Sequence, residues 1–362
     1  MKAPVVLILG PLRSAVSGVS THLNVLFGSA LERHFRMEQF QVGSAGRNET
    51  LPGRALRLLA SPFLLAAAIV RHGATIVHIN TSLDAKAYWR DLVYVLVAKL
   101  GGARVVYQVH GGAIRVFGKN FLIRKILART LTWPDVVVVI SQIELESARA
   151  LAPRQRIELL PNGTRCAEIL SARDDAPAAA PLRLLYIGRL VDTKGIFESI
   201  EALKILRGKG IEARLTIAGS GPEDQALRQS AAALGIEDRV SFAGAIFGEA
   251  KLRLLAQADV LMLPSYHLEG LPYALLEGMA AGLVPIVTRV GAIPDVVTPE
   301  VHGLFVPPRD PQAVAAALES LHADRATLAR MGAAARERVK SHYSVDRVAG
   351  DFTVLYRILV GA

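Results

Sequence analysis

The chain has 362 residues, a length that corresponds to about two domains. Hydrophobic residues make up 51% of it and charged residues 20%, a composition that excludes disorder over most of the chain. The single cysteine, Cys166, excludes a disulfide framework and a cysteine-based zinc site, and it fits a reducing compartment.

The formal net charge of +10 is unevenly distributed. Residues 1–170 contain 21 Lys and Arg residues and 10 Asp and Glu residues, whereas residues 171–362 are nearly neutral. A basic half beside a neutral half indicates an anionic partner for the first half, such as nucleic acid, anionic lipid or a phosphorylated substrate. An ordinary solvated surface explains the same excess equally well.

Short apolar runs alternate with helical stretches along the whole chain. The predicted strands are Val5–Leu9, Thr75–Ile79, Arg104–Val109, Val136–Ile140, Ile157–Leu160, Leu182–Ile187, Arg214–Ala218, Val240–Phe242, Val260–Leu263, Pro285–Val287 and Leu304–Val306. They carry Val, Ile and Leu on both faces, which is typical of strands buried in parallel sheets. Alternation with helices predicts an α/β fold with right-handed crossovers.

The most apolar helical stretch is Pro62–Val70. Ser61 fits an N-cap, Pro62 the first helical residue and Gly73 the residue that ends the helix. We interpret it as a buried crossover helix rather than a helix on a membrane surface. No run reaches the ~20 apolar residues of a membrane span, and no secretory signal is recognised, so we expect a cytoplasmic protein.

Residues 171–180 read SARDDAPAAA and have no apolar periodicity, which predicts a linker. We therefore expect an N-terminal Rossmann-like domain over 1–170 and a second one over 181–342, facing each other across a cleft. Ligands of such sheets bind at the carboxyl ends of the strands. Two sites in one cleft would suit the transfer of a group between two substrates.

The segment Pro264–Gly282 combines a loop, a helix start at Pro272 and two glutamates. The amides of Gly270, Leu271 and Tyr273 would meet a diphosphate at the positive end of this helix. Glu269 lies in the loop, and Glu277 follows eight positions later on the helix, where it is available for ligand hydroxyls.

Two cations, Arg189 and Lys194, follow the strand Leu182–Ile187, where they can neutralise a departing diphosphate. Gly219 and Gly221 resemble the start of a dinucleotide fingerprint but lack its third glycine, so they predict only a turn that lets backbone approach a ligand.

In the first half, Gly18 precedes a helical stretch and can approach a phosphate. His110 stands at a strand end beside two glycines and is a candidate for the cleft. The chain has no Walker A sequence, no G-x-S-x-G elbow and no Asp-x-Asp pair, so we expect neither a P-loop NTPase, a standard α/β-hydrolase nor a metal-bound diphosphate.

Taken together, these motifs resemble the retaining glycosyltransferases of family 4, or group 1, whose fold is GT-B. The resemblance covers most of the chain and follows the order VHIN, HGG, LLPNG, IGRLVDTKG, TIAGSGPE, VSFAGAI, ADVLMLPSYHLEGLPYALLEGMAAGLVPIVT, GAIPDVV and GLFVPP. The resemblance implies that Arg189 and Lys194 contact the donor phosphates and that Glu277 binds the ribose. It also implies that a C-terminal helix over 343–362 crosses back to the first domain.

By the same resemblance, Glu269 with the amides of Gly270 and Leu271 approaches the donor sugar and distal phosphate. The main chain of Ala245 and Ile246 meets the base, Gly18 lies at the diphosphate and His110 lies near the donor sugar.

The resulting hypothesis is a retaining, metal-independent hexosyltransferase that uses a nucleotide-diphosphate sugar and no cofactor. A sugar-nucleotide 2-epimerase of the same architecture is the first alternative, and it would need acid–base groups. A nucleic-acid-binding protein is the alternative from another class, but no basic motif interleaved with aromatics is present.

For the acceptor, the resemblance implies a polyprenyl-diphosphate-linked saccharide of bacterial surface polysaccharide synthesis, reached on the cytoplasmic face of the inner membrane. The basic half would then hold the enzyme on an anionic membrane surface. The candidate residues are Arg47, Arg54, Arg57, Arg115, Lys119, Arg124 and Lys125, with apolar insertion near Phe117 or Phe121.

Overall fold

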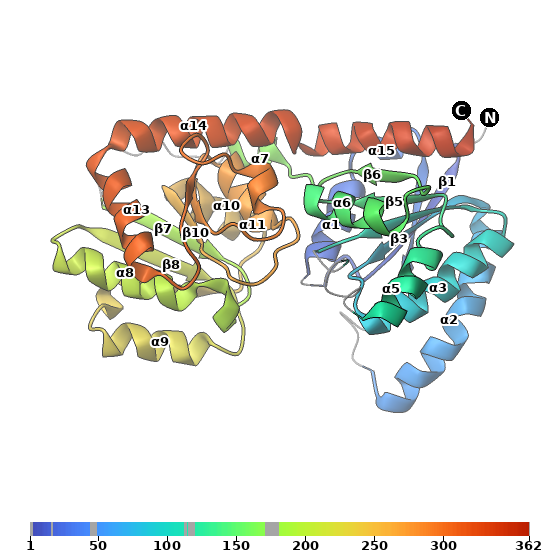
Figure 1. The fold of residues 1–362 in the computed structure, drawn as a ribbon, viewed down its shortest axis with the longest axis horizontal. Coiled ribbons are helices and arrows are strands. Elements are labelled where there is room, and N and C mark those ends of the chain that lie inside the picture. The colour runs from blue at the N-terminus through green and yellow to red at the C-terminus, as the bar shows by residue number, and fades with distance from the viewer. Residues whose placement is uncertain are drawn as a thin grey trace. The chain divides into compact units, whose positions relative to one another are not determined.

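The computed structural model describes residues 3–15, 17–43, 49–111, 114, 120–170 and 181–361 (Figure 1). The chain divides into two compact units, of which the first is Met1–Gly163 with Val345–Ala362 and the second is Thr164–Ser344. Each unit contains one six-stranded sheet in which every strand pair is parallel. The α/β class expected from the sequence is therefore confirmed.

The sheet of the first unit has the strand order β2-β1-β3-β4-β5-β6. Its strands are β1 Val5–Gly10, β2 Arg36–Gln41, β3 Ala74–Thr81, β4 Arg104–Val109, β5 Val136–Val139 and β6 Ile157–Leu159. Its helices are α1 Gly18–Leu26, the short η1 Ala30–Arg33, α2 Leu51–His72, α3 Ala85–Leu100, α5 Phe121–Thr130, α6 Gln142–Leu151 and α15 Val345–Val360.

Both faces of this sheet are buried, which explains the continuous apolar runs of its central strands. Leu7 and Leu9 of β1 belong to a core cluster with α2, α3, α5 and α6. Val6 and Ile8 of the same strand belong to a second cluster with α1 and α15, to which α15 contributes Phe352. Alternate side chains of one strand thus support two layers of helices.

The sheet of the second unit has the order β12-β11-β10-β7-β8-β9. Its strands are β7 Leu182–Ile187, β8 Ala213–Ala218, β9 Val240–Gly244, β10 Val260–Leu263, β11 Val284–Val287 and β12 Leu304–Phe305. Its helices are α7 Cys166–Leu170, η2 Asp192–Lys194, α8 Ile196–Gly208, α9 Asp224–Ala233, η3 Glu237–Arg239, α10 Gly248–Gln257, α11 Tyr273–Ala280, α12 Ile293–Val296, α13 Pro311–Ala323 and α14 Arg325–His342.

Each of the eleven predicted strands corresponds to a strand of the structure, with ends that differ by at most two residues. Strand β2, Arg36–Gln41, was not predicted. It lies at the sheet edge, pairs only with β1 and has no fully buried residue, so its sequence RMEQFQ lacks the apolar run that marks the other strands.

The prediction for the apolar helix was wrong in two respects. Helix α2 begins at Leu51 with Thr50 as its N-cap, so Ser61 and Pro62 lie inside it. Pro62 cannot donate to the carbonyl of Leu58, and the Ser61 hydroxyl donates to that carbonyl instead, at 3.1 Å.

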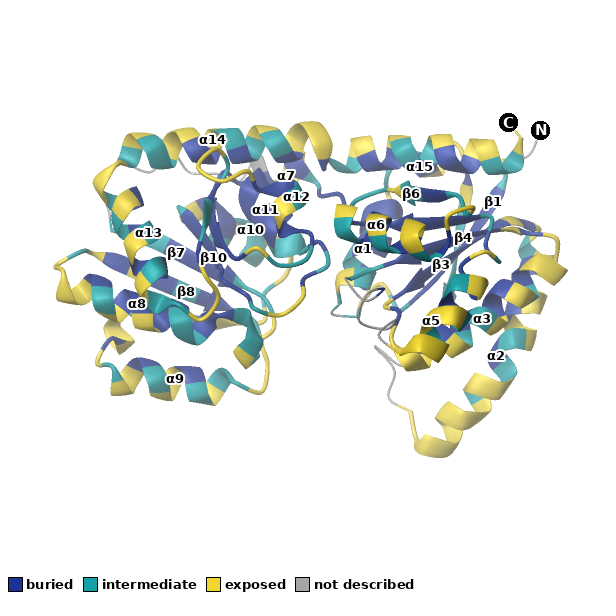
Figure 2. Cartoon of the chain, viewed as in Figure 1, coloured by how far each residue is buried: buried dark blue, intermediate teal, exposed yellow. Residues whose placement is uncertain are grey.

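The second error concerns burial, because most of α2 is exposed, as Figure 2 shows. Only Ser61, Leu65 and Ile69 are buried, and Tyr94 of α3 donates a hydrogen bond to the Ser61 hydroxyl at 2.8 Å. Apolar periodicity identifies a helix, but it does not say whether each apolar face meets protein. Gly73 ends the helix with φ +63°, as predicted.

The division into units also differs from the expected boundary at residue 170. The Thr164 amide donates to the carbonyl of Tyr343 at 2.8 Å, and Thr164 forms a bridge with Ser344. Residues from Thr164 through α7 therefore belong to the second unit. The predicted linker 171–180 lies outside the described residues.

Candidate functional site

The candidate site of the second unit lies where its strand order reverses. Strands β7 and β10 are neighbours at the centre of the sheet, and the chain continues from them toward opposite edges. Such a switch point separates the loops at the carboxyl ends of the strands, and ligands of open α/β sheets bind there. Arg189 and Lys194 follow β7, and Glu269 follows β10.

Lys194 and Glu269 meet in a short ion pair at this edge. The Lys194 Nζ lies 2.5 Å from Glu269 Oε1, although 75 positions separate the two residues. Their side chains are 18% and 9% exposed, so water screens the pair little. Removing one partner would leave a charge in a poorly hydrated place.

The loop that carries Glu269 is held by backbone packing. Gly291 has φ +54°, and a Cβ built on it would stand 1.6 Å from the carbonyl oxygen of Glu269. Ala292 donates to the carbonyls of Glu269 and Gly270. A side chain at 291 would push the loop away, so glycine there fixes the position of Glu269.

The glycine pair after β8 packs against backbone of the protein itself. A Cβ on Gly219 would lie 1.8 Å from the carbonyl oxygen of Gly188, and one on Gly221 would lie 2.1 Å from that of Leu190. The Leu190 amide also donates to the carbonyl of Ser220. These glycines let two loops of the protein pack together, and through this contact they position the segment that carries Arg189.

Arg189 is exposed, and among the described residues its guanidinium makes no ion pair or hydrogen bond. Its main chain is nevertheless fixed, because the buried Tyr186 hydroxyl donates to the Arg189 carbonyl at 2.7 Å. Arg189 is therefore a cation on a fixed backbone at the carboxyl edge of the sheet.

Glu277 lies on α11 and is 8% exposed. The Nζ of Lys251, on α10, lies 2.6 Å from Glu277 Oε1. Burial raises the pKa of Glu277, and the Lys251 ammonium opposes this effect. Sequence reasoning missed Lys251, because 26 positions separate it from Glu277 and no motif contains both.

Helix α11 begins one residue later than expected. Pro272 has ψ 127°, so it occupies the N-cap rather than the first helical position, and its carbonyl accepts from the amides of Leu275 and Leu276. Gly270 and Leu271 precede this cap, at the positive end of the helix. Ala245 and Ile246 lie between β9 and α10, with Ala245 exposed and Ile246 half-buried.

Gly18 and His110 belong to the first unit. Gly18 is the first residue of α1 and is exposed, and the Ser17 side chain caps this helix by accepting from the Ser20 amide. His110 follows β4 directly and is half-buried. Gly112, the second glycine of the motif, lies outside the described residues.

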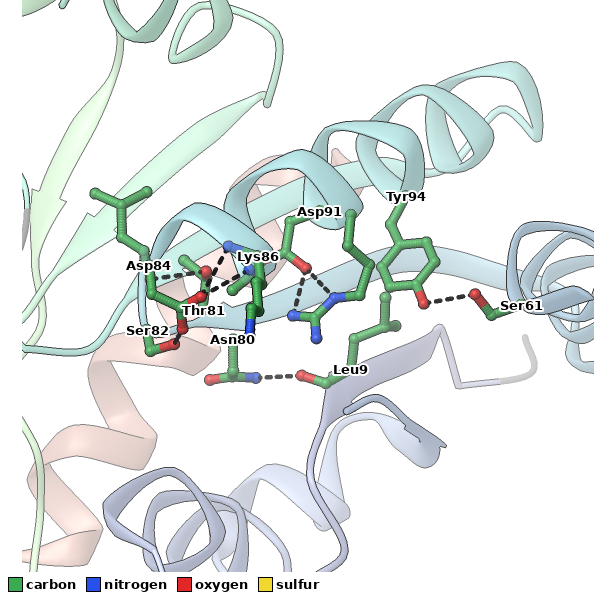
Figure 3. Close-up of polar contacts among 12 residues, drawn as sticks. Leu9, Ser61, Asn80, Thr81, Ser82, Asp84, Lys86, Asp91 and Tyr94 are labelled. Carbon is green, nitrogen blue, oxygen red and sulfur yellow. Dashed lines mark hydrogen bonds and ion pairs between the residues drawn. The ribbon is translucent and has the colours of Figure 1, made fainter. Parts of the chain in front are cut away.

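The hydrogen bonds of Asn80 define which nitrogen of His110 carries the proton. The Asn80 Nδ2 donates to the carbonyl of Leu9 at 3.1 Å, a contact drawn in Figure 3. A carbonyl only accepts, so the Asn80 Oδ1 faces His110 and accepts from its Nε2 at 2.8 Å. In the neutral ring, Nδ1 is then the acceptor.

Two further histidines, missed from the sequence, pack near His110. The ring centroid of His22 lies 4.7 Å from that of His110, and His78 Nδ1 lies 2.6 Å from the Tyr356 hydroxyl. Burial lowers the pKa of His22 to about 4 and that of His78 to about 3, and it also lowers the pKa of His110. All three rings are therefore neutral at pH 7.

The described residues contain no cluster of three or more His, Cys, Asp or Glu side chains that could hold a metal ion. The expected metal independence remains a prediction.

Comparison with known proteins adds independent information. Residues 173–338 match the family described as "Glycosyl transferases group 1", and residues 25–168 match "Glycosyltransferase Family 4". A GDP-mannose-dependent alpha-(1-6)-phosphatidylinositol monomannoside mannosyltransferase of Mycobacterium tuberculosis is 33% identical over 272 residues, which are 70% of this chain and 69% of that protein.

The amylovoran biosynthesis glycosyltransferase AmsK of Erwinia amylovora is 35% identical over 169 residues, or 45% of this chain. That match spans 42% of the length of AmsK, so the chain corresponds to less than half of this relative. Among solved structures, a sucrose-phosphate synthase of Thermosynechococcus elongatus has a TM-score of 0.80 at 22% identity and covers 99% of this chain and 100% of its own.

This likeness shows the GT-B fold, in agreement with the two parallel sheets. Neither family description names an epimerase. The chain belongs to the group 1, or family 4, glycosyltransferases.

Proposed function

We propose that the protein is a retaining, metal-independent glycosyltransferase that takes a sugar from a nucleotide-diphosphate sugar bound at the carboxyl edge of the second sheet. The observation that carries this proposal is the pair of cations at the switch point. Arg189 has a fixed backbone and an exposed guanidinium for which the described part of the chain shows no ion pair, and Lys194 is held by Glu269. Cations there are suited to a leaving diphosphate.

In the proposed reaction, the bond between the anomeric carbon and the phosphate oxygen breaks while the acceptor oxygen bonds to the same face of that carbon. A phosphate oxygen takes the acceptor's proton. Arg189 and Lys194 stabilise the charge that grows on the departing phosphate. An ammonium has three donors, so Lys194 can keep its contact with Glu269 and still donate to a phosphate oxygen.

The remaining residues are proposed to position the donor. The Glu277 carboxylate has two oxygens, and only Oε1 accepts from Lys251, which leaves acceptor capacity for ribose hydroxyls. By the family resemblance, the main chain at Ala245 and Ile246 meets the base. Gly270 and Leu271 serve the distal phosphate.

For the first unit, the resemblance assigns Gly18 to the diphosphate and His110 to the donor sugar. The neutral His110 would offer Nδ1 as an acceptor for a sugar hydroxyl, because Asn80 holds the proton on Nε2. These two roles are proposals that rest on family likeness and on local geometry.

We infer a lipid-linked saccharide as the acceptor, in bacterial surface polysaccharide synthesis at the cytoplasmic face of the inner membrane. One relative acts on a phosphatidylinositol mannoside and another serves amylovoran biosynthesis, by their names. The basic excess of residues 1–170 supports an anionic acceptor or membrane.

Donor binding tests the proposal without knowledge of the acceptor. Titration calorimetry with UDP-glucose, GDP-mannose and ADP-glucose should identify at least one nucleotide sugar that binds. Arg189→Met should weaken that binding at least tenfold, a typical effect of losing one charge-assisted contact. Arg214→Met is the matched control, because Arg214 is exposed on the same sheet but lies near the amino end of β8.

Two results would contradict the assignment. The first is that none of the three nucleotide sugars binds. The second is that Arg214→Met weakens binding as much as Arg189→Met does, since general loss of positive charge would then explain the effect.

A further inference from the structure

Helix α2 of the first unit exposes an unusual amount of apolar surface. Its first ten residues, Leu51–Ala60, include no buried residue, and Figure 2 shows this end of the helix as almost entirely exposed. The large apolar side chains exposed on α2, with their exposed fractions, are Leu51 82%, Leu56 69%, Leu58 43%, Leu59 73%, Phe63 78%, Leu64 55% and Val70 81%. Exposure of so many large apolar side chains to water is unfavourable. It therefore indicates that another molecule or a membrane covers this surface.

Four of these seven exposed side chains form one stripe along the helix. Leu56, Leu59, Phe63 and Val70 are spaced by three, four and seven residues, which places them on one face. The buried residues Leu65 and Ile69 lie on the opposite face by the same geometry and pack in the core. Helix α2 is thus apolar on two faces, of which only one packs against other parts of the chain within the described residues.

Among the described helices, α2 alone is long and apolar enough to span a membrane, with 22 residues and a mean hydropathy of 1.5 over an 18-residue window. Its attachment argues against spanning. Ser61 accepts a hydrogen bond from Tyr94, and Ile69 is 3% exposed in the core of the unit. A helix fixed along one side to a folded unit can present only its other side to lipid, in the plane of the interface.

The charges near this stripe favour an anionic surface. Helix α2 contains Arg54, Arg57 and Arg71 and no acidic residue. Arg57 is neutralised by Glu49 at 2.7 Å, whereas Arg54 and Arg71 are exposed, and no ion pair is seen for either within the described ranges.

Helix α5 of the same unit repeats the combination of apolar and basic side chains. Phe121 is 71% exposed, and the Nζ of Lys125 lies 4.5 Å from its ring centroid. Arg124 is exposed, and α5 also lacks acidic residues. Of the other residues expected at a membrane, Arg47, Arg115, Phe117 and Lys119 lie outside the described residues.

We propose that the exposed face of α2, defined by Leu56, Leu59, Phe63 and Val70, inserts into the interfacial region of an anionic lipid bilayer, with Arg54 and Arg71 among the headgroups. The biological purpose rests on the proposed lipid-linked acceptor, whereas the surface itself is carried by the exposed apolar side chains of α2. A second copy of the chain is a poorer occupant, because a symmetric contact through α2 would bring arginines together with no acidic residue between them.

Vesicle sedimentation tests this surface. The full chain should sediment with vesicles of phosphatidylcholine containing phosphatidylglycerol at low salt, and much less with phosphatidylcholine alone or at 0.5 M salt, at which screening is strong. The variant Leu59→Ser with Phe63→Ser should bind the anionic vesicles at least tenfold more weakly. Both side chains are exposed, so the fold should tolerate the change.

The matched control is Val354→Ser with Ile358→Ser on α15. This pair has the same spacing of four, lies in the same unit and is 60% and 54% exposed. It should leave vesicle binding unchanged. Nucleotide-sugar binding by the Leu59 and Phe63 variant should equal that of the wild type, which separates this inference from the donor assignment.

Three results would overturn the proposal: no binding to anionic vesicles at low salt, equal loss of binding in the two double variants, or dimerisation that Leu59→Ser with Phe63→Ser abolishes while vesicle binding persists. The last result would assign the face to a second copy.

Discussion

Variants of the Lys194–Glu269 pair can separate the contribution of Lys194 to stability from its contribution to catalysis. In the variant Lys194→Met, the Glu269 carboxylate would stay at a position where its side chain is only 9% exposed and would have lost its cation. Removing one partner of a buried pair costs about 3–5 kcal/mol of unfolding free energy. The double variant with Glu269→Gln should lose less, because no charge remains buried.

An exposed pair of the same composition is the control. Lys209 and Glu319 also belong to the second unit and lie 2.6 Å apart, but their side chains are 49% and 42% exposed. Lys209→Met should therefore cost no more than about 1 kcal/mol. Urea unfolding should be followed by circular dichroism, because both tryptophans, Trp89 and Trp133, lie in the first unit.

Turnover gives the second readout. If Lys194 stabilises the leaving phosphate, the single and double variants should both lose about 10- to 1000-fold in kcat at saturating donor. The reasoning on burial is refuted if Lys194→Met costs no more stability than Lys209→Met. The catalytic assignment is refuted if the double variant recovers wild-type turnover, since Lys194 would then act only by neutralising Glu269.

Three other predictions concern Glu277, the hydrogen bond between Asn80 and His110, and Asp91, a fully buried residue of α3. Glu277→Gln should raise the KM for the donor by about 10- to 100-fold and change kcat less, because ribose contacts hold in ground and transition states alike; the reverse pattern in steady-state kinetics would place Glu277 in the chemical step. Burial raises the pKa of Asp91 to about 6. Since an unfolded Asp has a pKa of about 3.9, the group's contribution to stability should fall by about 3 kcal/mol as pH rises from about 4 to above 6. Asp91→Asn should remove this fall. The unfolding free energy of the variant and of the wild type should be measured in urea at pH 4 and at pH 7. If the difference between the two proteins is the same at both pH values, the prediction is wrong. In Asn80→Leu, no amide oxygen would hold the His110 proton on Nε2. The neutral ring should then be a mixture of the Nε2–H and Nδ1–H tautomers in 15N NMR, whereas the wild type should show the Nε2–H tautomer alone.

The sequence allowed the sheets to be predicted because their central strands are buried on both faces. Val136–Val139, for example, is a run of four valines with every residue buried. The same rule missed β2, whose edge position leaves polar side chains in water, and it misjudged α2. An apolar stripe that faces lipid and one that faces protein have the same spacing, so periodicity could not distinguish them.

The sequence allowed three candidate residues to be placed on one edge of the sheet, but it did not reveal their contacts. Strand ends and a helix start placed Arg189, Lys194 and Glu269 on one edge, because carboxyl ends of parallel strands meet there. The ion pairs Lys194–Glu269 and Lys251–Glu277 join residues 75 and 26 positions apart, and only folding brings them together. The packing role of Gly219 likewise depends on a neighbouring loop that no local pattern specifies.

The charge balance of the site limits how the proposed donor can be held. A nucleotide-diphosphate sugar brings two negative charges, whereas Arg189, Lys194 and Glu269 together supply a net charge of one positive. The N-terminus of α11 adds the equivalent of about half a charge through its backbone dipoles. Because Gly291 and Ala292 fix the loop before this helix, that contribution is oriented before the donor arrives. Backbone amides on this fixed loop are therefore as necessary to the proposed mechanism as the two cations, and substituting Gly291 should impair donor binding without removing any charge.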